Sequence, residues 1–265
     1  MKKVSIIVPA YNEEKRIGKM LKTYLEFFER LRKNNLLNYE LLVVINGTSD
    51  GTEMVVKEFQ KNNPRLLFLN FKEAGKGLAI LEGFKDALER DVNLIGFVDA
   101  DMATPPEAFY DLIRKIDHHD GVIASRWIRK SIIVRKQNLV GQIKSKVFNF
   151  LVRSLFLFPY HDTQCGAKLF TMDAISKVIE NVGITSWAFD IDLLYKLRKN
   201  GLNVVEVPTL WENMAETKVK LIKNSTEMAF AVIRLRLIHS PLAFIVRVYD
   251  SIPERFKIHS RILLS

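Results

Sequence analysis

The sequence has little cysteine and no long uninterrupted apolar run. Cys165 is the only cysteine, so no internal disulfide can form and nothing points to an oxidising compartment. No stretch of 18 residues is free of polar interruption, which argues against a membrane-spanning helix. The first apolar run, residues 4–9, is too short for a secretory signal, and we expect none.

Several common binding motifs are also missing. No G-x-G-x-x-G follows the first apolar run, which disfavours a nicotinamide dinucleotide, and the G-x-x-x-x-G-K-[ST] spacing of a P-loop is absent. The five histidines show no H-x-x-x-H spacing, and no zinc-finger or RNA-stacking motif occurs. These absences argue against nicotinamide-dependent dehydrogenases, P-loop nucleoside triphosphatases, zinc enzymes with that histidine spacing and the corresponding nucleic-acid-binding modules.

What the chain does have is enough apolar material for a core. Of its 265 residues, 48% are hydrophobic and 26% charged, and the mean hydropathy is +0.02. This composition indicates one large globular domain or two small ones, and argues against a disordered chain or a polytopic membrane protein.

The positive charge is concentrated in two segments. The formal net charge is +10, with +8 in residues 126–153 and +6 in residues 218–265. Both segments interleave Lys and Arg with apolar residues. Such a pattern fits nucleic acid, a membrane surface, or core helices whose basic side chains reach water. The density of Phe and Leu favours the membrane surface over nucleic acid, and we expect no nucleic-acid partner.

The first half of the chain alternates apolar runs of strand length with helical patterns. The runs lack polar alternation, which is typical of strands buried on both faces of a parallel sheet. After residue 124 we expect a helix over 138–157, a polar loop over 161–166, a strand over 167–170, helices over 173–180 and 190–200, and a strand over 204–207. Residues 217–248 predict a basic amphipathic helix, broken near Pro241. The expected strands of the first half are 4–9, 40–45, 66–70, 94–98 and 121–124, and the helices are 13–33, 52–61, 75–90 and 106–118.

Polar residues gather where three of the expected strands end. In a parallel sheet, ligands bind beyond the carboxyl ends of the strands, and these three ends lie at one edge. The site is therefore predicted at residues 9–13, 46–52 and 99–101.

Asp99 and Asp101 carry the clearest chemistry at this edge. Two carboxylates one residue apart after a strand can converge on Mg²⁺ or Mn²⁺, which bridge substrate phosphates, although Asp is also common in solvated turns. Asp50 fits either a hydrogen bond to a nucleobase or a helix N-cap. Lys76, at the start of a helix, fits either phosphate binding or a flexible turn.

Taken together, these motifs resemble family 2 inverting glycosyltransferases of the GT-A fold. The first four are Val8-Pro-Ala-Tyr-Asn-Glu13, Asn46-Gly-Thr-Ser-Asp50-Gly-Thr52, Gly75-Lys-Gly77 and Asp99-Ala-Asp101. Ala124-Ser-Arg126 resembles an element of polyprenyl-phosphate glycosyltransferases. Asp162-Thr-Gln-Cys-Gly-Ala-Lys-Leu-Phe170 and Trp187-Ala-Phe-Asp-Ile-Asp192 are similar to dolichyl-phosphate β-glucosyltransferases, with the mannose synthases as close relatives. The resemblance covers about residues 3–240.

The resemblance implies a role for each matching residue. Asp99 and Asp101 would hold the divalent metal on the diphosphate, and Lys76 would contact phosphate or base. Asp190 and Asp192 fall in the family's acidic motif, where glutamate is usual at the second position. Pro9, Tyr11 and Glu13 would line the nucleoside pocket with Asp50 on the base, Asp162 and Gln164 would lie near the donor sugar, and Arg126 and Arg135 would bind the acceptor phosphate.

We therefore expect an α/β, mainly parallel GT-A domain over residues 1–215 and a basic amphipathic helical extension over 216–265. The expected reaction moves a hexose, by preference from UDP-glucose, to dolichyl or polyprenyl phosphate. Helices near 143–158 and 225–248 would attach the enzyme peripherally to the cytoplasmic face of a membrane.

Three alternatives stay open at this stage. Within the class, a mannosyl or N-acetylhexosamine donor fits the same motifs. A soluble glycan acceptor would require a general base such as Asp190 or Asp192. A degenerate binding or scaffold protein is disfavoured because the metal-site pair, Lys76 and the arginines are all present.

Overall fold

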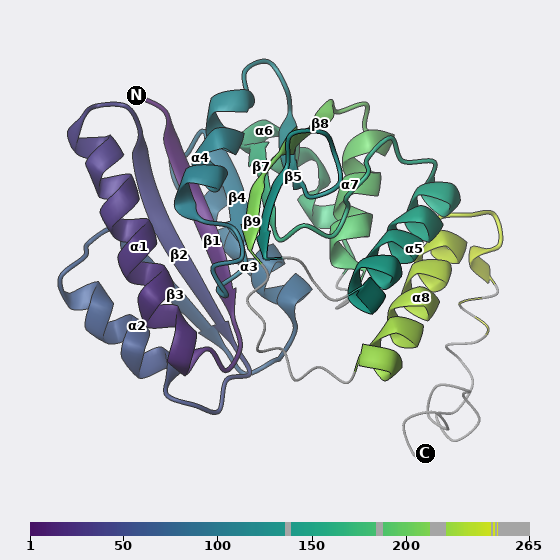
Figure 1. Ribbon diagram of the computed structural model, residues 1–265, viewed down its shortest axis with the longest axis horizontal. Coiled ribbons are helices and arrows are strands. Elements are labelled where there is room, and N and C mark those ends of the chain that lie inside the picture. Colours follow the sequence, from purple (N-terminus) through teal and green to yellow (C-terminus); the bar gives the residue numbers. More distant parts are fainter. Residues whose placement is uncertain (136–138, 184–187, 213–220, 245, 247, 249–265) are drawn as a thin grey trace.

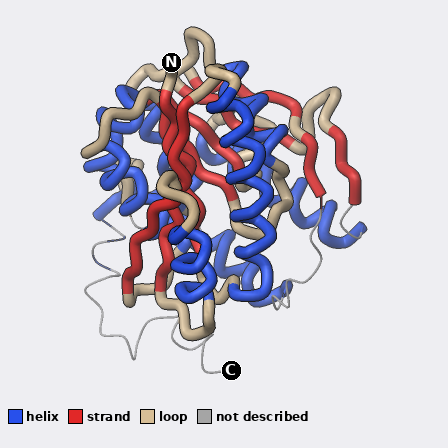
Figure 2. Tube along the Cα trace, turned by 90° about the vertical axis from the view of Figure 1, so that its left-hand side faces the viewer, coloured by secondary structure: helices blue, strands red, loops and turns tan. Residues whose placement is uncertain are grey.

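The computed structural model describes residues 1–135, 139–183, 188–212, 221–244, 246 and 248. A seven-stranded sheet forms its centre, with helices on both sides of the strands (Figures 1 and 2). The strand order is β3-β2-β1-β4-β7-β5-β8, and β6 and β9 form a separate parallel pair. The strands are β1 Lys3–Ala10, β2 Asn38–Asn46, β3 Leu66–Phe71, β4 Leu94–Val98, β5 Gly121–Ser125, β6 Ile132–Arg135, β7 Ala167–Thr171, β8 Val204–Pro208 and β9 Leu210–Glu212. The helices are α1 Glu14–Lys33, α2 Thr52–Lys61, α3 Lys76–Leu88, α4 Pro106–Lys115, α5 Leu139–Phe156, α6 Met172–Val178, η1 Ile179–Asn181, α7 Phe189–Lys199 and α8 Leu221–Ile238.

The expected parallel sheet is confirmed with one exception. β7 runs antiparallel between β4 and β5, while the other six strands are parallel to one another. The central strands are continuous apolar runs because both of their faces are covered. In β2, for example, every residue after Asn38 is buried. The two short strands β6 and β9 were not expected from the sequence; they have only four and three residues, and among the described strands each pairs only with the other.

The helices divide between the two faces of the sheet. α1, α2 and α4 pack on one face, and α3, α6 and α7 pack on the other together with α5 and α8. α1 buries Ile17, Met20, Leu21, Tyr24, Leu25, Phe28 and Leu31, the spacing of one stripe on a helix.

The basic amphipathic helices α5 and α8 lie side by side at one end of the molecule (Figure 1). Val152 and Phe156 of α5 and Val232 and Leu235 of α8 are buried in the same apolar cluster as the sheet. α8 ends at Ile238, close to the break expected near Pro241. The predicted boundary at 215/216 falls outside the described residues. Among those described, no helix is long and apolar enough to cross a membrane.

Candidate active site

Hydrogen bonds join the loops after β1 and β2 at the carboxyl edge of the sheet. The amide of Ser49 donates to Asn12 Oδ1 at 2.9 Å, and the amide of Glu13 donates to Thr52 Oγ1 at 2.8 Å. Asn12 adopts a left-handed backbone, with φ of 53°, which Asn tolerates better than most residues. Two of the three predicted strand ends are therefore fixed to each other.

Asp50 is the centre of this connection. Its Oδ2 accepts from the amide of Glu14 at 3.1 Å, and its Oδ1 accepts from the amide of Thr52 at 3.0 Å. Desolvation raises the pKa of Asp50, but the hydrogen bonds from the Thr52 side chain and from backbone amides outweigh it, so the pKa is lowered overall. Both carboxylate oxygens thus hold the loop in shape, and contact with a nucleobase stays a prediction.

The predicted nucleoside residues of the first loop differ in what they face. Pro9 is half-buried in β1, whereas Tyr11 is 54% exposed just beyond the strand. The Glu13 carboxylate is paired with Arg16 at 2.7 Å. Burial raises the pKa of Glu13 more than the hydrogen bond and charge of Arg16 lower it, and the charges of Asp101 and Asp99 add to the rise. The contact of Glu13 with a nucleoside stays a prediction.

Lys76 and the two aspartates after β4 form the core of the cluster. Lys76 Nζ lies 2.5 Å from Asp99 Oδ1. Asp101 Oδ1 accepts a hydrogen bond from the amide of Ala103 at 2.9 Å. The pKa of Asp101 is raised, mainly by burial and then by the charge of Asp99. The structure brings all three predicted residues together.

Close backbone packing holds this cluster in place. The amide of Asp99 donates to the carbonyl of Gly166 at 3.1 Å, and a Cβ at Gly166 would overlap the Asp99 carboxylate. A Cβ at Gly77 would lie 2.8 Å from Cβ of Phe189. Glycine at these two positions lets β7 and α7 approach the residues that bear the charges.

Asp190 joins the cluster through a lysine that the sequence analysis did not single out. Lys168 lies in the central strand β7 with no exposed surface, and its Nζ donates to Asp190 Oδ1 at 2.6 Å and to the Cys165 carbonyl at 2.8 Å. The charge of Asp190 also acts on Lys76. Lys168 is thus a buried counter-ion that orients the Asp190 carboxylate. A lysine inside an apolar strand was the available signal, since buried lysines are rare unless paired.

Asp192 lies outside this cluster. Its Oδ2 accepts from the amide of Gly183 at 2.7 Å, and its Oδ1 lies 2.8 Å from His239 Nε2. The Asp192 and His239 side chains are 2% and 8% exposed. Of the two acidic residues in the motif, Asp190 is paired with the buried Lys168, whereas Asp192 fastens α7 to the residue that follows α8.

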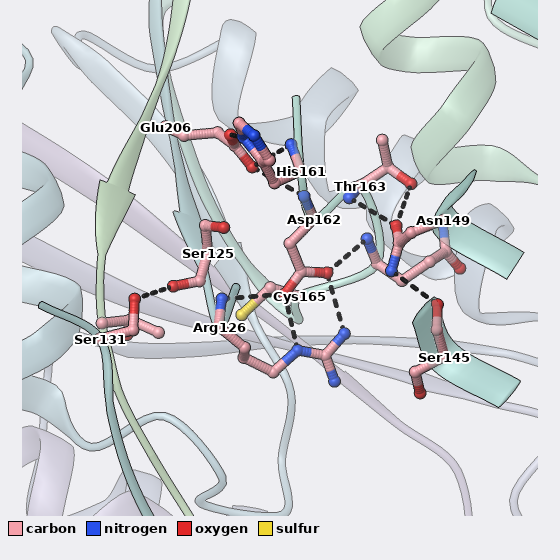
Figure 3. Close-up of polar contacts among 12 residues, drawn as sticks. Ser125, Arg126, Ser131, Ser145, Asn149, His161, Asp162, Thr163, Cys165 and Glu206 are labelled. Carbon is pink, nitrogen blue, oxygen red and sulfur yellow. Dashed lines mark hydrogen bonds and ion pairs between the residues drawn. The ribbon is translucent and has the colours of Figure 1, made fainter. Parts of the chain in front are cut away.

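Arg126 and Asp162 form a buried ion pair (Figure 3). Asp162 Oδ2 accepts from Arg126 Nε at 2.7 Å and from its amide at 3.0 Å, and Oδ1 accepts from Arg126 Nη2 at 2.9 Å. Asp162 has no exposed surface. Burial raises the pKa of Asp162, but the charge and hydrogen bonds of Arg126 outweigh burial and lower it. In this structure Asp162 orients the arginine, and its contact with the donor sugar stays a prediction.

Further residues surround this pair (Figure 3). Glu206 Oε1 accepts from the amides of His161 and Asp162, both at 2.7 Å. Asn149 Oδ1 accepts from the amide of Thr163 at 3.1 Å. The backbone amide of Gln164 donates a hydrogen bond to Asp162 Oδ1 at 3.2 Å. The buried side-chain nitrogen Nε2 of Gln164 has no hydrogen-bond partner among the described residues. Glu206 and Asn149 come from β8 and α5, so no local motif in the sequence could have indicated them.

The remaining predicted residues are only partly placed. Arg135 is the last residue of β6, and it lies opposite Glu212 in the register of β6 and β9. The side chain of Arg135 lies outside the described part of the structure. Trp187, which belongs to the acidic motif, lies outside the described residues altogether. Cys165 is buried, and burial is the main cause that raises its thiol pKa to about 12, so it is inert.

Asp99 and Asp101 fit a divalent cation. Both supply hard oxygen donors. Burial raises the pKa of Asp101, and the negative charge of Asp99 raises it further. A bound cation would offset the repulsion between the two carboxylates. Within the described ranges, no group of three or more His, Cys, Asp or Glu side chains is arranged for a metal. Magnesium-type sites commonly use one or two carboxylates and complete the coordination with substrate phosphates and water, so two are sufficient.

Comparison with known proteins agrees with this arrangement. The family model described as glycosyl transferase family 2 matches residues 5–179. A dolichyl-phosphate beta-glucosyltransferase of Dictyostelium discoideum is 31% identical, over 88% of this chain and 73% of its own length. A second, from Trichomonas vaginalis, is 34% identical, over 89% of this chain and 73% of its own. Glucosyl-3-phosphoglycerate synthase from Mycobacterium tuberculosis, solved with Mn²⁺, UDP and glucosyl-3-phosphoglycerate, superposes with a TM-score of 0.66 at 16% identity. That match covers 89% of this chain and 80% of that one. The chain has the expected GT-A fold, and the predicted charged residues lie at the carboxyl edge of its sheet. The chain belongs to glycosyl transferase family 2 and is a glycosyltransferase.

Proposed function

We propose that this enzyme transfers one glucosyl residue from UDP-glucose to dolichyl or a related polyprenyl phosphate, with inversion at the anomeric carbon. The Asp99 carboxylate packs against Gly166, and Asp162, four residues earlier in the same loop, binds the buried cation Arg126. This proximity of a metal–diphosphate site and a phosphate site is the observation that carries the proposal. The names of the relatives, which are dolichyl-phosphate beta-glucosyltransferases, support the donor and the acceptor.

We assign the divalent metal, Mg²⁺ or Mn²⁺, to Asp99 and Asp101. Fold neighbours solved with Mn²⁺ and UDP or UDP-glucose support this assignment. When bound, the metal neutralises the negative charge that develops on the departing diphosphate. Lys76 supplies a second positive charge beside Asp99.

In the proposed step, an oxygen of the acceptor phosphate attacks the anomeric carbon of the donor. The bond between that carbon and the diphosphate oxygen breaks, and its electron pair stays on the nucleoside diphosphate. The attacking phosphate is already ionised near neutral pH, so no general base is required. The enzyme must instead hold two anions close together. Arg126, oriented by Asp162, supplies a fixed positive charge for the acceptor.

We further propose that the enzyme attaches peripherally to the cytoplasmic face of a membrane, because a polyprenyl acceptor stays in the bilayer. Exposed apolar side chains on α5 and α8 support this, including Phe150 at 71% and Phe230 at 61% exposure. Both helices belong to the positively charged segments, and basic amphipathic helices bind anionic lipid surfaces. Flotation with anionic liposomes at low salt tests this: the protein should rise with the vesicles, and protein left at the bottom would refute attachment.

The reaction is tested with purified enzyme and a panel of labelled nucleotide sugars on dolichyl phosphate, with Mg²⁺ or Mn²⁺ and with EDTA. We expect metal-dependent product from UDP-glucose and none with EDTA. Product from GDP-mannose alone would identify a mannosyltransferase. No product from any donor, with folded protein, would favour a degenerate scaffold. Asp99→Asn serves as the matched inactive variant.

A further inference from the structure

A ladder of cations and indole rings leads from Arg126 to α5. The Arg126 guanidinium carbon lies 5.3 Å from the ring centroid of Trp211 and 5.6 Å from that of Trp127. Lys146 Nζ of α5 lies 5.5 Å from the same Trp127 centroid. Cations at such distances from an indole ring are held electrostatically. Trp127 therefore contacts both Arg126 and Lys146.

Two buried side-chain hydrogen-bond donors near Arg126 have no partner among the described residues. Trp127 Nε1 is buried and has no hydrogen-bond partner within the described part of the chain, and the same holds for Gln164 Nε2. Buried polar atoms are nearly always paired, so each such group requires an explanation. An indole N–H can only donate. Two unpaired donors beside the cations Arg126 and Lys146 fit an anion rich in acceptor oxygens.

The face of α5 that bears Lys146 is apolar and exposed. Ile143, Val147 and Phe150 are 60%, 61% and 71% exposed. With Lys146 they occupy positions i, i+3, i+4 and i+7, which lie on one stripe of a helix. The opposite face of the same helix, with Val152 at 0% exposure, already supplies the core contact. The stripe is therefore a second apolar surface, and the described residues leave it exposed.

We propose that Lys146 and Trp127 extend the acceptor site from Arg126, and that the stripe Ile143–Val147–Phe150 binds the first isoprene units of the acceptor chain. The ligand is a single amphiphile with a phosphate head and an apolar tail, which fits a site where Lys146 lies within the exposed apolar stripe of α5. This inference rests on the proposed function, because it takes a polyprenyl phosphate as the acceptor. Lys146 and Trp127 act here as specificity-determining residues for that acceptor.

Direct binding tests the inference independently of catalysis. Farnesyl phosphate, a soluble 15-carbon probe, is titrated into the full chain without membranes while tryptophan fluorescence is recorded. We expect a saturable change that Trp127→Phe reduces. Lys146→Met should weaken binding about tenfold, the effect of losing one charge-assisted contact. Lys144→Met, the same charge change on the same helix but off the stripe, should bind as the wild type does.

The contact between the stripe and the isoprene tail is tested with a second pair of matched variants. Phe150→Ser should weaken farnesyl phosphate and leave the five-carbon isopentenyl phosphate unchanged, whereas Phe230→Ser on α8 should change neither. Both side chains are exposed, so folding is not at risk. Equal binding by wild type and Lys146→Met would overturn the phosphate assignment. Equal effects of Phe150→Ser and Phe230→Ser would show a general lipid surface instead of an acceptor groove.

The same variants separate this inference from the proposed function. If the wild type binds farnesyl phosphate through Lys146 but forms no product with any donor, the inferred acceptor site is supported and the proposed reaction is refuted. If the wild type glucosylates dolichyl phosphate, and Lys146→Met leaves the KM for a short acceptor unchanged, the proposed reaction is supported and the inferred role of Lys146 is refuted.

Discussion

The ion pair between Arg126 and Asp162 predicts a large cost for Asp162→Asn. The substitution keeps the side-chain volume but removes the charge that faces an arginine only 10% exposed. Three hydrogen bonds from Arg126, at 2.7, 2.9 and 3.0 Å, end on this carboxylate. Removing one partner of a buried pair costs about 3–5 kcal/mol. For a domain of this size that lowers Tm by roughly 6–20 °C.

The measurement is thermal unfolding at several pH values, with transfer activity assayed in parallel. The pKa of Asp162 is lowered in the folded protein, so its stabilisation is complete above the unfolded pKa near 3.9 and is lost as pH falls through the folded pKa. The Tm difference between wild type and variant should therefore stay constant from pH 5 to 8. A double variant with Arg126→Gln should recover part of the loss, because no charge is then left unpaired. A Tm within about 1 °C of the wild type would refute the buried pair.

Three other substitutions test the rest of the site. Lys168→Met should lower kcat at least tenfold, about 1.4 kcal/mol, because Asp190 loses its orienting partner, and an unchanged kcat would exclude a positioning role. Gly166→Ala should abolish metal-dependent transfer, since a methyl group there overlaps the Asp99 carboxylate. The control Gly18→Ala, with only ordinary contacts at 3.6 Å, should stay active. Equal activities of the two variants would contradict the close packing at Gly166. His239→Leu should lower Tm, because it removes a partner of a buried carboxylate, and His239→Gln should restore most of the loss; equal Tm values for both variants would argue against the contact.

The sequence predicted most of the fold because the signals were local. Strands such as β2 and β4 are continuous apolar runs, and helices such as α1 repeat with a period near 3.6. The direction of β7 was not predictable, since the sequence of a five-residue strand does not show which neighbours it pairs with. The pair β6 and β9 depends on residues 75 or more positions apart, and short strands with exposed side chains carry little pattern.

For the site, the sequence identified residue types but not their partners. Asp99, Asp101 and Lys76 lie together because strand ends share one edge, which topology alone predicts. The separation of Asp190 from Asp192 follows from helix geometry, because residues two apart point to different sides. That Asp162 binds Arg126 depends on the fold, since the two are 36 positions apart.

The central claim is that the acceptor is an ionised lipid phosphate. The most direct measurement offers labelled UDP-glucose and Mg²⁺ to the enzyme with dolichyl phosphate, with dolichol, or with a soluble oligosaccharide, and determines the anomeric configuration of any product. The account predicts β-linked product from dolichyl phosphate alone, since dolichol and the oligosaccharide would both require a general base. Product from either of those two acceptors, or a retained α linkage, would contradict it.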